Sequence, residues 1–297
     1  MNKLSGYIDA SGKQEALNDK VLVVALSLAT PFYWQEFSKE WIGLLRESGY
    51  PVEAGDTDPC FHATEWHHKR RPFREEFGWD EVRREKLYSG LVSLIQKRTE
   101  YSVATAVDLD DYRRFIAKYP AAEHMWSSAG AFAFAMCLWK CREWAIERKY
   151  QETIPYVYDR GDKFADEMRS EYDHLCEDAE RAKWWFFKPG GMIDGHKKSV
   201  VPIQAVDVVA WEVAKNYKQM RAAQGDPGLF ASRSELIQLA SFNAEYKVYG
   251  YEDYLWFWED RLESWSEDIK NRLLMKGTIG DPDEFDKDFA RQELERL

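Results

Sequence analysis

The sequence lacks a paired cysteine framework, a long apolar run and a basic, apolar leader. Its four cysteines follow no regular spacing, and Cys137 and Cys141 lie in an apolar stretch where reduced cysteines pack as small hydrophobic side chains. The longest apolar runs, 21–29 and 129–139, are shorter than the ~20 residues that cross a bilayer. These absences predict a reduced, cytoplasmic protein that does not enter a membrane.

Two common enzyme motifs are absent as well. Gly190, Gly191 and Gly195 lack the strand-turn-helix spacing of a phosphate loop, and no Gly-x-Ser-x-Gly nucleophile elbow occurs. A formal net charge of −11 argues against a protein that coats nucleic acid by bulk attraction. It leaves room for an enzyme with a local basic groove.

What is present is an alternation of strands and helices in a chain of 297 residues with 45% hydrophobic content, which fits a globular protein. Strands are predicted over 6–12, 21–28, 101–107 and 153–159, with a fifth beginning at 184–187, and the main helices over 31–47, 80–98, 123–149, 163–176 and 203–220. This order predicts a five-stranded mixed sheet flanked by helices over residues 1–222, followed by a helical extension over 223–297.

Three aspartates recur in similar settings. Asp9 ends the first predicted strand, Asp159 ends the fourth, and Asp207 lies in the first turns of the helix opened by Pro202. If the first and fourth strands are parallel neighbours, Asp9 and Asp159 meet, and close carboxylates require a proton or a cation between them. Such oxygen clusters suit Mg²⁺ or Mn²⁺, and two ions can clamp the oxygens of phosphodiester cleavage.

Each aspartate also has a purely structural interpretation. Asp9 and Asp159 both precede turns, where aspartate is common, and Asp207 lies where a helix dipole favours negative charge. Gln204 lies one helical turn before Asp207, so both side chains can face the same point, although Gln204 could equally bond a loop backbone.

The segment 60–72 contains a second set of candidates. His62 and Glu65 are spaced to contribute to a site, with Glu65 as a fourth acidic ligand or a solvated loop residue. The neighbouring histidines match no compact zinc pattern. Lys69, Arg70 and Arg71 follow directly; they form either a solvated charge run or contacts to a phosphate backbone.

Four motifs in this order resemble the bacterial and phage family called domain of unknown function 3800. Its members open with a strand ending in an Asp-Glu-Ser-Gly-like turn, here residues 8–12, and continue with a Phe-His-Ala-like segment, here residues 61–65. A later strand ends on aspartate, here residues 156–159, and a final helix carries a Gln-x-x-Asp pattern, here Gln204 to Asp207. The resemblance covers residues 5–220.

The resemblance implies a ribonuclease H-like fold with a five-stranded mixed sheet and metal ligands at Asp9, Asp159 and Asp207. The chain departs from the family pattern at Ala10, where an acidic residue is usual. Strand alternation predicts that this side chain points away from Asp9.

Together these observations favour metal-dependent phosphodiester hydrolysis of nucleic acid, in phage or mobile-element biology, with Mg²⁺ or Mn²⁺ as cofactor. Ser11, His62 and Gln204 are predicted to orient substrate or water, and Glu65 is a further catalytic candidate. Two alternatives remain open: a non-catalytic module that keeps the fold to bind nucleic acid or protein, and a phosphatase-type enzyme acting on a small molecule. The oligomeric state is not predicted.

Overall fold

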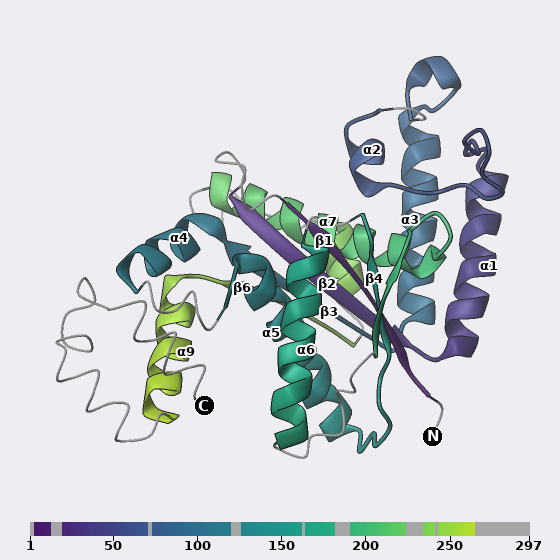
Figure 1. Ribbon diagram of the computed structural model, residues 1–297. Helices are drawn as coiled ribbons and strands as arrows, with labels where there is room; N and C mark the ends of the chain where they lie inside the picture. The colour runs from purple at the N-terminus through teal and green to yellow at the C-terminus, as the bar shows by residue number, and fades with distance from the viewer. Residues whose placement is uncertain are drawn as a thin grey trace.

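The described part of the chain contains a six-stranded mixed sheet with helices on both faces (Figure 1). The computed structural model describes residues 3–12, 20–70, 73–119, 126–161, 164–181, 191–223, 234–240 and 243–264. The strand order is β5-β4-β1-β2-β3-β6. β2 pairs antiparallel with β1 and β3, whereas β1–β4, β4–β5 and β3–β6 are parallel pairs. Among the described strands, β2 alone therefore runs against the others.

The strands are β1 (Ser5–Ser11), β2 (Val21–Ala29), β3 (Tyr101–Asp108), β4 (Tyr156–Asp159), β5 (Met192–Gly195) and β6 (Ala244–Tyr249). The α-helices are α1 (Pro31–Glu47), α2 (Ala63–His67), α3 (Glu81–Arg98), α4 (Leu109–Lys118), α5 (Ala129–Glu147), α6 (Ala165–Arg181), α7 (Val201–Ala222), α8 (Ser234–Ala240) and α9 (Tyr251–Ser264), and a short 3₁₀ helix covers Glu75–Phe77. Among the described residues, no helix has the length and apolar character needed to cross a membrane.

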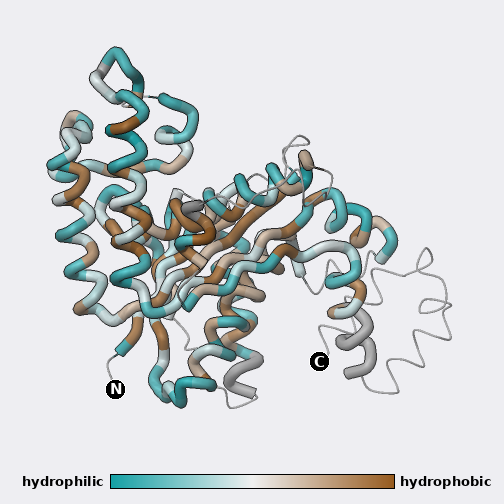
Figure 2. The backbone as a smooth tube through the Cα atoms, turned by 180° about the vertical axis from the view of Figure 1, so that it is seen from behind, coloured by the Kyte–Doolittle hydropathy of each residue, from teal (hydrophilic) through white to brown (hydrophobic). Residues whose placement is uncertain are grey.

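The central strand β2 is buried on both faces, which explains its unbroken apolar sequence. Its side chains alternate between two cores. Leu22, Val24 and Leu26 belong to the core that includes α5 and α6, whereas Val23 and Ala25 belong to the core that includes α1, α3 and α7. Figure 2 shows the apolar residues concentrated along the central strands.

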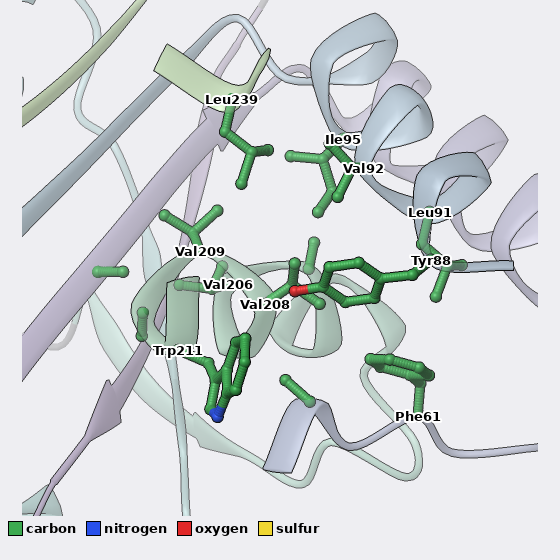
Figure 3. Close-up of a cluster of buried hydrophobic side chains, with 14 of the residues drawn as sticks. Phe61, Tyr88, Leu91, Val92, Ile95, Val206, Val208, Val209, Trp211 and Leu239 are labelled. Carbon is green, nitrogen blue, oxygen red and sulfur yellow. The ribbon is translucent and has the colours of Figure 1, made fainter. Parts of the chain in front are cut away.

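The second core is dominated by aromatic and β-branched side chains (Figure 3). Tyr88 extends from α3 toward α7, where its hydroxyl donates to Glu212 Oε1 at 2.6 Å. Its ring stacks on Trp66, with centroids 3.9 Å apart. This core fixes α7 against the sheet, and α7 packs across β1 and β2.

Local signals set several element boundaries as predicted. Pro31 opens α1, and Thr30 caps it by accepting a hydrogen bond from the Tyr33 N–H. The helix ends at Ser48–Gly49, where Gly49 has φ +69° and meets no Cβ penalty. β1 and β2, which a short segment of the chain connects, pair antiparallel.

The prediction of five strands and a purely helical C-terminal extension is wrong. Residues 244–249 form β6, which pairs parallel with the edge of β3. Tyr246 and Val248 pack on one core and Tyr249 lies in the other, the period-2 pattern of a strand. A strand of six residues that lies between two helices gives only a short alternating pattern in the sequence.

Several other boundaries differ from the predictions, and two of them are instructive. α5 begins at Ala129, six residues after the predicted start, because Ser128 caps it by accepting from the Ala131 N–H. β5 lies at Met192–Gly195, which the sequence did not predict as a strand. The predicted strand start at 184–187 lies outside the described residues.

The topology creates a switch point between β1 and β4. From β1 the chain first builds β2 and β3 on one side, then crosses over to build β4 and β5 on the other. In open α/β sheets, ligands bind outside the carboxyl ends of the strands at such a point. The carboxyl ends of β1 and β4 are therefore the first place to look for a site.

Candidate functional site

Asp9 lies near the carboxyl end of β1 and is 2% exposed. Strand alternation separates it from its neighbours: Ile8 lies in the core that includes α5 and α6, and Ala10 packs against the same core. The prediction that residue 10 points away from Asp9 is therefore confirmed. Ala10 therefore does not line the α7 side of the sheet.

Asp159 ends β4 and is 4% exposed. β4 is the parallel neighbour of β1, with Tyr158 in register with Ile8, so the condition for Asp9 and Asp159 to meet is fulfilled. Asp207 comes from α7, the helix that packs over β1 and β2. Two strand ends and one helix thus bring together three residues that are far apart in the sequence.

The centre of this acidic group is occupied by Lys197, from the loop between β5 and α7. Its Nζ lies 3.2 Å from Asp9 Oδ2, 3.2 Å from Asp159 Oδ2 and 4.0 Å from Asp207 Oδ1. Burial by itself would lower the pKa of Lys197, but the carboxylates of Asp207, Asp9 and Asp159 raise it well above its ordinary value. Lys197 is therefore a charged ammonium held by three carboxylates.

Each carboxylate uses its second oxygen to accept a backbone N–H. Asp9 Oδ1 accepts from Ala10 at 3.0 Å, and Asp159 Oδ1 accepts from Gly161 at 3.3 Å. Asp207 Oδ2 accepts from Ala63, at the start of α2, at 3.1 Å. The backbone bonds fix the orientation of each carboxylate, so that the remaining oxygens converge on one cation.

Gln204 is fully buried and supports the loop that carries Lys197. Its Oε1 accepts from Trp41 Nε1 at 2.8 Å and from the Phe61 N–H at 2.9 Å, and its Nε2 donates to the Lys197 carbonyl at 2.8 Å. The prediction that Gln204 orients substrate or water directly does not fit this geometry, because its amide is enclosed by protein partners. Gln204 instead joins α1, the segment before α2 and the Lys197 loop.

The loop that carries Lys197 is held in place by its neighbours. The His196 carbonyl accepts from the Ser199 and Val200 N–H groups, both at 2.8 Å, which closes a tight turn. Lys198 points the other way and forms ion pairs with Glu53 and with Asp56, the latter at 3.0 Å. The two adjacent lysines therefore form ion pairs with two different sets of carboxylates.

The start of α2 forms one wall of the site. His62 is half-buried beside Cys60, with 3.6 Å between Nε2 and Sγ, and burial raises the pKa of the Cys60 thiol to about 12. Glu65 is also half-buried; burial raises its pKa, an effect that the charge of His62 partly offsets and that of Asp207 increases. His62 and Glu65 therefore flank the residue whose N–H binds Asp207, although neither is among the residues that form ion pairs with Lys197 Nζ.

The other predicted residues are distributed around this centre. Ser11 ends β1, two residues beyond Asp9 and on the same strand face, and is half-buried. Lys69 and Arg70 are exposed after α2, but Lys69 forms an ion pair with Glu81 at 3.1 Å. Arg71 lies outside the described residues.

The three carboxylates are ligands of the type that a hard divalent cation prefers, but in this structure they hold the Lys197 ammonium. Among the described residues, no three His, Cys, Asp or Glu side chains are arranged to hold a metal ion. The carboxylate oxygens of Asp9, Asp159 and Asp207 are nevertheless the ligand type that Mg²⁺ and Mn²⁺ prefer, and they already surround a positive charge.

Sequence reasoning found the three aspartates and missed Lys197. A lysine after a strand looks like any solvated loop residue. One signal was available: three converging carboxylates require a positive charge, and Lys197 and Lys198 come shortly before Gln204 and Asp207 in the chain. Charge balance could therefore have identified one of these two lysines as the partner of the three aspartates.

Comparisons with known proteins leave the family of this chain open. No family model matches the sequence, and no curated protein matches it. Among solved structures, the chain is similar to one in the PCNA:RNase HII complex from Archaeoglobus fulgidus, with 15% identity, 80% of this chain and 86% of that chain covered, and a TM-score of 0.33. A likeness of that size does not establish a shared fold.

Proposed function

We propose that this protein is a metal-dependent phosphodiester hydrolase of the ribonuclease H-like type. One observation carries the proposal: Asp9, Asp159 and Asp207 each present one oxygen to a common cation position at the switch point of the sheet. The mixed sheet, in which β1 and β4 are parallel neighbours, is in keeping with that fold.

Charge balance supports a divalent ion in this site. Three carboxylates around one ammonium leave an excess of negative charge in a nearly closed space. Asp9, Asp159 and Asp207 would hold Mg²⁺ or Mn²⁺, which supplies Lewis acidity toward a phosphoryl oxygen and activates water. The backbone bonds to the second oxygens keep the carboxylates oriented before substrate arrives.

The residues around the aspartates supply the remaining roles. We assign to His62 and Glu65, at the start of α2, the orientation of water or a leaving group, because the neighbouring Ala63 N–H binds Asp207 and the charge of Asp207 acts on Glu65. Arg70 is exposed just beyond α2, where it can bind a phosphate of the substrate backbone. The chain as a whole has a net charge of −11 and would repel a polyanion. A positive charge beside the site is therefore suited to a local contact with one phosphate of a nucleic acid. The resemblance to the domain of unknown function 3800 family is part of the same proposal.

The test is hydrolysis of end-labelled single- and double-stranded DNA and RNA in Mn²⁺ or Mg²⁺, by the parent chain and by Asp159→Asn. Asp194→Asn is the matched control, because Asp194 lies on the neighbouring strand β5 and pairs with Arg160. We expect metal-dependent cleavage that Asp159→Asn abolishes and Asp194→Asn retains. No metal-dependent cleavage of any substrate, or equal cleavage by both variants, would refute the proposal.

The second candidate is a module that binds nucleic acid or protein without catalysis, and Lys197 is the observation that favours it. A lysine that stays permanently bound to the three aspartates would stabilise the fold without a metal ion. Nucleic-acid binding by the parent chain with neither cleavage nor Mn²⁺ binding would support this candidate over the hydrolase.

A further inference from the structure

The β5–α7 loop places a positive charge where the proposed function requires a metal ion. Lys197 Nζ lies 3.2 Å from one oxygen of Asp9 and 3.2 Å from one oxygen of Asp159. A Mg²⁺ ion coordinated by the same oxygens would stand about 2.0–2.1 Å from each. Two cations cannot share that space, because they would repel at contact distance. Lys197 and a metal ion therefore exclude each other.

We propose that Lys197 is a resident counter-cation that a divalent metal ion must displace, so that it sets the metal affinity of the site. The inference rests on the proposed function and deepens it. Lys197 stabilises the aspartates while the metal is absent, because otherwise three buried carboxylates would repel one another. A divalent ion brings twice the charge of the ammonium, which favours the exchange.

The backbone that carries Lys197 is anchored, so the exchange that we propose moves the side chain. Gln204 Nε2 donates to the Lys197 carbonyl, and the turn closed by the His196 carbonyl holds the rest of the loop. The Lys197 side chain is 16% exposed, so its flexible stem has a route to solvent. Rotation of this side chain would vacate the cation position.

The direct test is a titration of the full chain with Mn²⁺, in which binding is measured as the loss of the electron paramagnetic resonance signal of free Mn²⁺. Lys197→Met removes the competing charge, and Lys198→Met is the matched control on the same loop. We expect Lys197→Met to lower the Mn²⁺ Kd by about tenfold or more, because in the parent the ammonium must leave the site before Mn²⁺ can bind, whereas in this variant the site is open. Lys198→Met is expected to bind as the parent does.

The outcomes separate this inference from the proposed function. If the parent and Lys197→Met bind Mn²⁺ equally well, the displacement is overturned while the hydrolase proposal stands. If neither binds Mn²⁺ at millimolar concentrations, both fall. Lys197→Gln, which keeps hydrogen-bonding capacity without charge, replaces Lys197→Met should the latter not fold.

A second measurement uses the unmodified chain. Acetylation of lysines, read by mass spectrometry, is expected to increase at Lys197 when Mn²⁺ is added, because the displaced amine faces solvent. Lys39, whose side chain is 63% exposed on α1, serves as the reference that should not change. Unchanged or reduced acetylation of Lys197 at saturating Mn²⁺ would overturn the proposal.

Discussion

Buried aspartates end two of the strands, β3 and β4, and they differ in how their oxygens are used. Asp108 ends β3, as Asp159 ends β4. Asp108 Oδ1 caps α4 by accepting from the Asp110 and Asp111 N–H groups, and Oδ2 accepts from Tyr217 and, at 2.8 Å, from Arg221. Both of its oxygens are therefore committed to partners within the fold.

The aspartates around Lys197 have a different kind of partner. Asp9, Asp159 and Asp207 each accept one backbone N–H, and each also presents an oxygen to the Lys197 ammonium. Asp108 and Asp159 are alike in residue type, burial and position at the end of a strand. What separates the structural aspartate from the candidate ligands is a single cation that three carboxylates share.

The sharpest test of this comparison is the pair Asp9→Asn and Asp108→Asn. We expect Asp9→Asn to reduce metal-dependent cleavage on the order of 100-fold or more, as for loss of a metal ligand or its support. Asp108→Asn is expected to retain cleavage per folded molecule and to lower the free energy of unfolding by about 1–3 kcal/mol, since it weakens charge-assisted hydrogen bonds. Cleavage assays and urea unfolding of both variants measure the two effects. The reverse pattern would show that the assignment of roles is wrong.

Gln204 supports the site through the fold, so its replacement should first affect stability. Gln204→Leu leaves the buried Trp41 Nε1 and Phe61 N–H groups without their acceptor. We expect the free energy of unfolding to fall by about 2–4 kcal/mol. The control is Gln219→Leu, at an exposed position on the same helix. Equal urea midpoints for the two variants would contradict the supporting role of Gln204.

The basic residues after α2 are expected to differ in their contribution to nucleic-acid binding. Lys69 is paired with Glu81, whereas Arg70 is exposed without an ion pair to any described residue. Arg70→Gln should weaken binding without sequence preference and reduce the salt slope of log K by about one unit. Lys69→Gln should have a smaller effect. Binding titrations over a range of NaCl concentrations measure both slopes, and unchanged slopes would rule out phosphate contacts here.

The smallest expected effect concerns the ionisation of Glu65. Burial raises its pKa, so the folded state favours the protonated carboxyl; the resulting stability is present below the ordinary glutamate pKa and lost as pH rises through the raised value. Glu65→Gln should therefore gain stability relative to the parent as pH rises above the ordinary glutamate pKa. Glu85→Gln, at an exposed position on α3, is the control. A stability difference that does not change with pH would argue against this cause.

Local chemistry made much of the fold predictable. Thr30 and Pro31 define the start of α1, Ser48–Gly49 its end, and the unbroken apolar run of β2 its place at the centre of the sheet. The missed elements, β5 and β6, have 4 and 6 residues, and their pairing partners are distant in sequence. For strands this short, tertiary pairing decides the structure more than local propensity does.

The three aspartates of the site could be predicted from the sequence, but the lysine that binds them could not. Strand ends and a helix start marked Asp9, Asp159 and Asp207, because topology brings such positions together. The orientation of a lysine side chain depends on what surrounds it after folding, so Lys197 resembled Lys198 in the sequence. Gln204 was placed correctly near Asp207, yet its burial depends on α1 and on the segment before α2.

An anomalous difference map from a crystal of the protein soaked in Mn²⁺ would show both the metal ion and the position of Lys197. We expect a peak bounded by carboxylate oxygens of Asp9, Asp159 and Asp207, with the Lys197 ammonium moved away from its present position. A map with no Mn²⁺ peak at these residues and with Lys197 still bound to the three carboxylates would contradict this expectation.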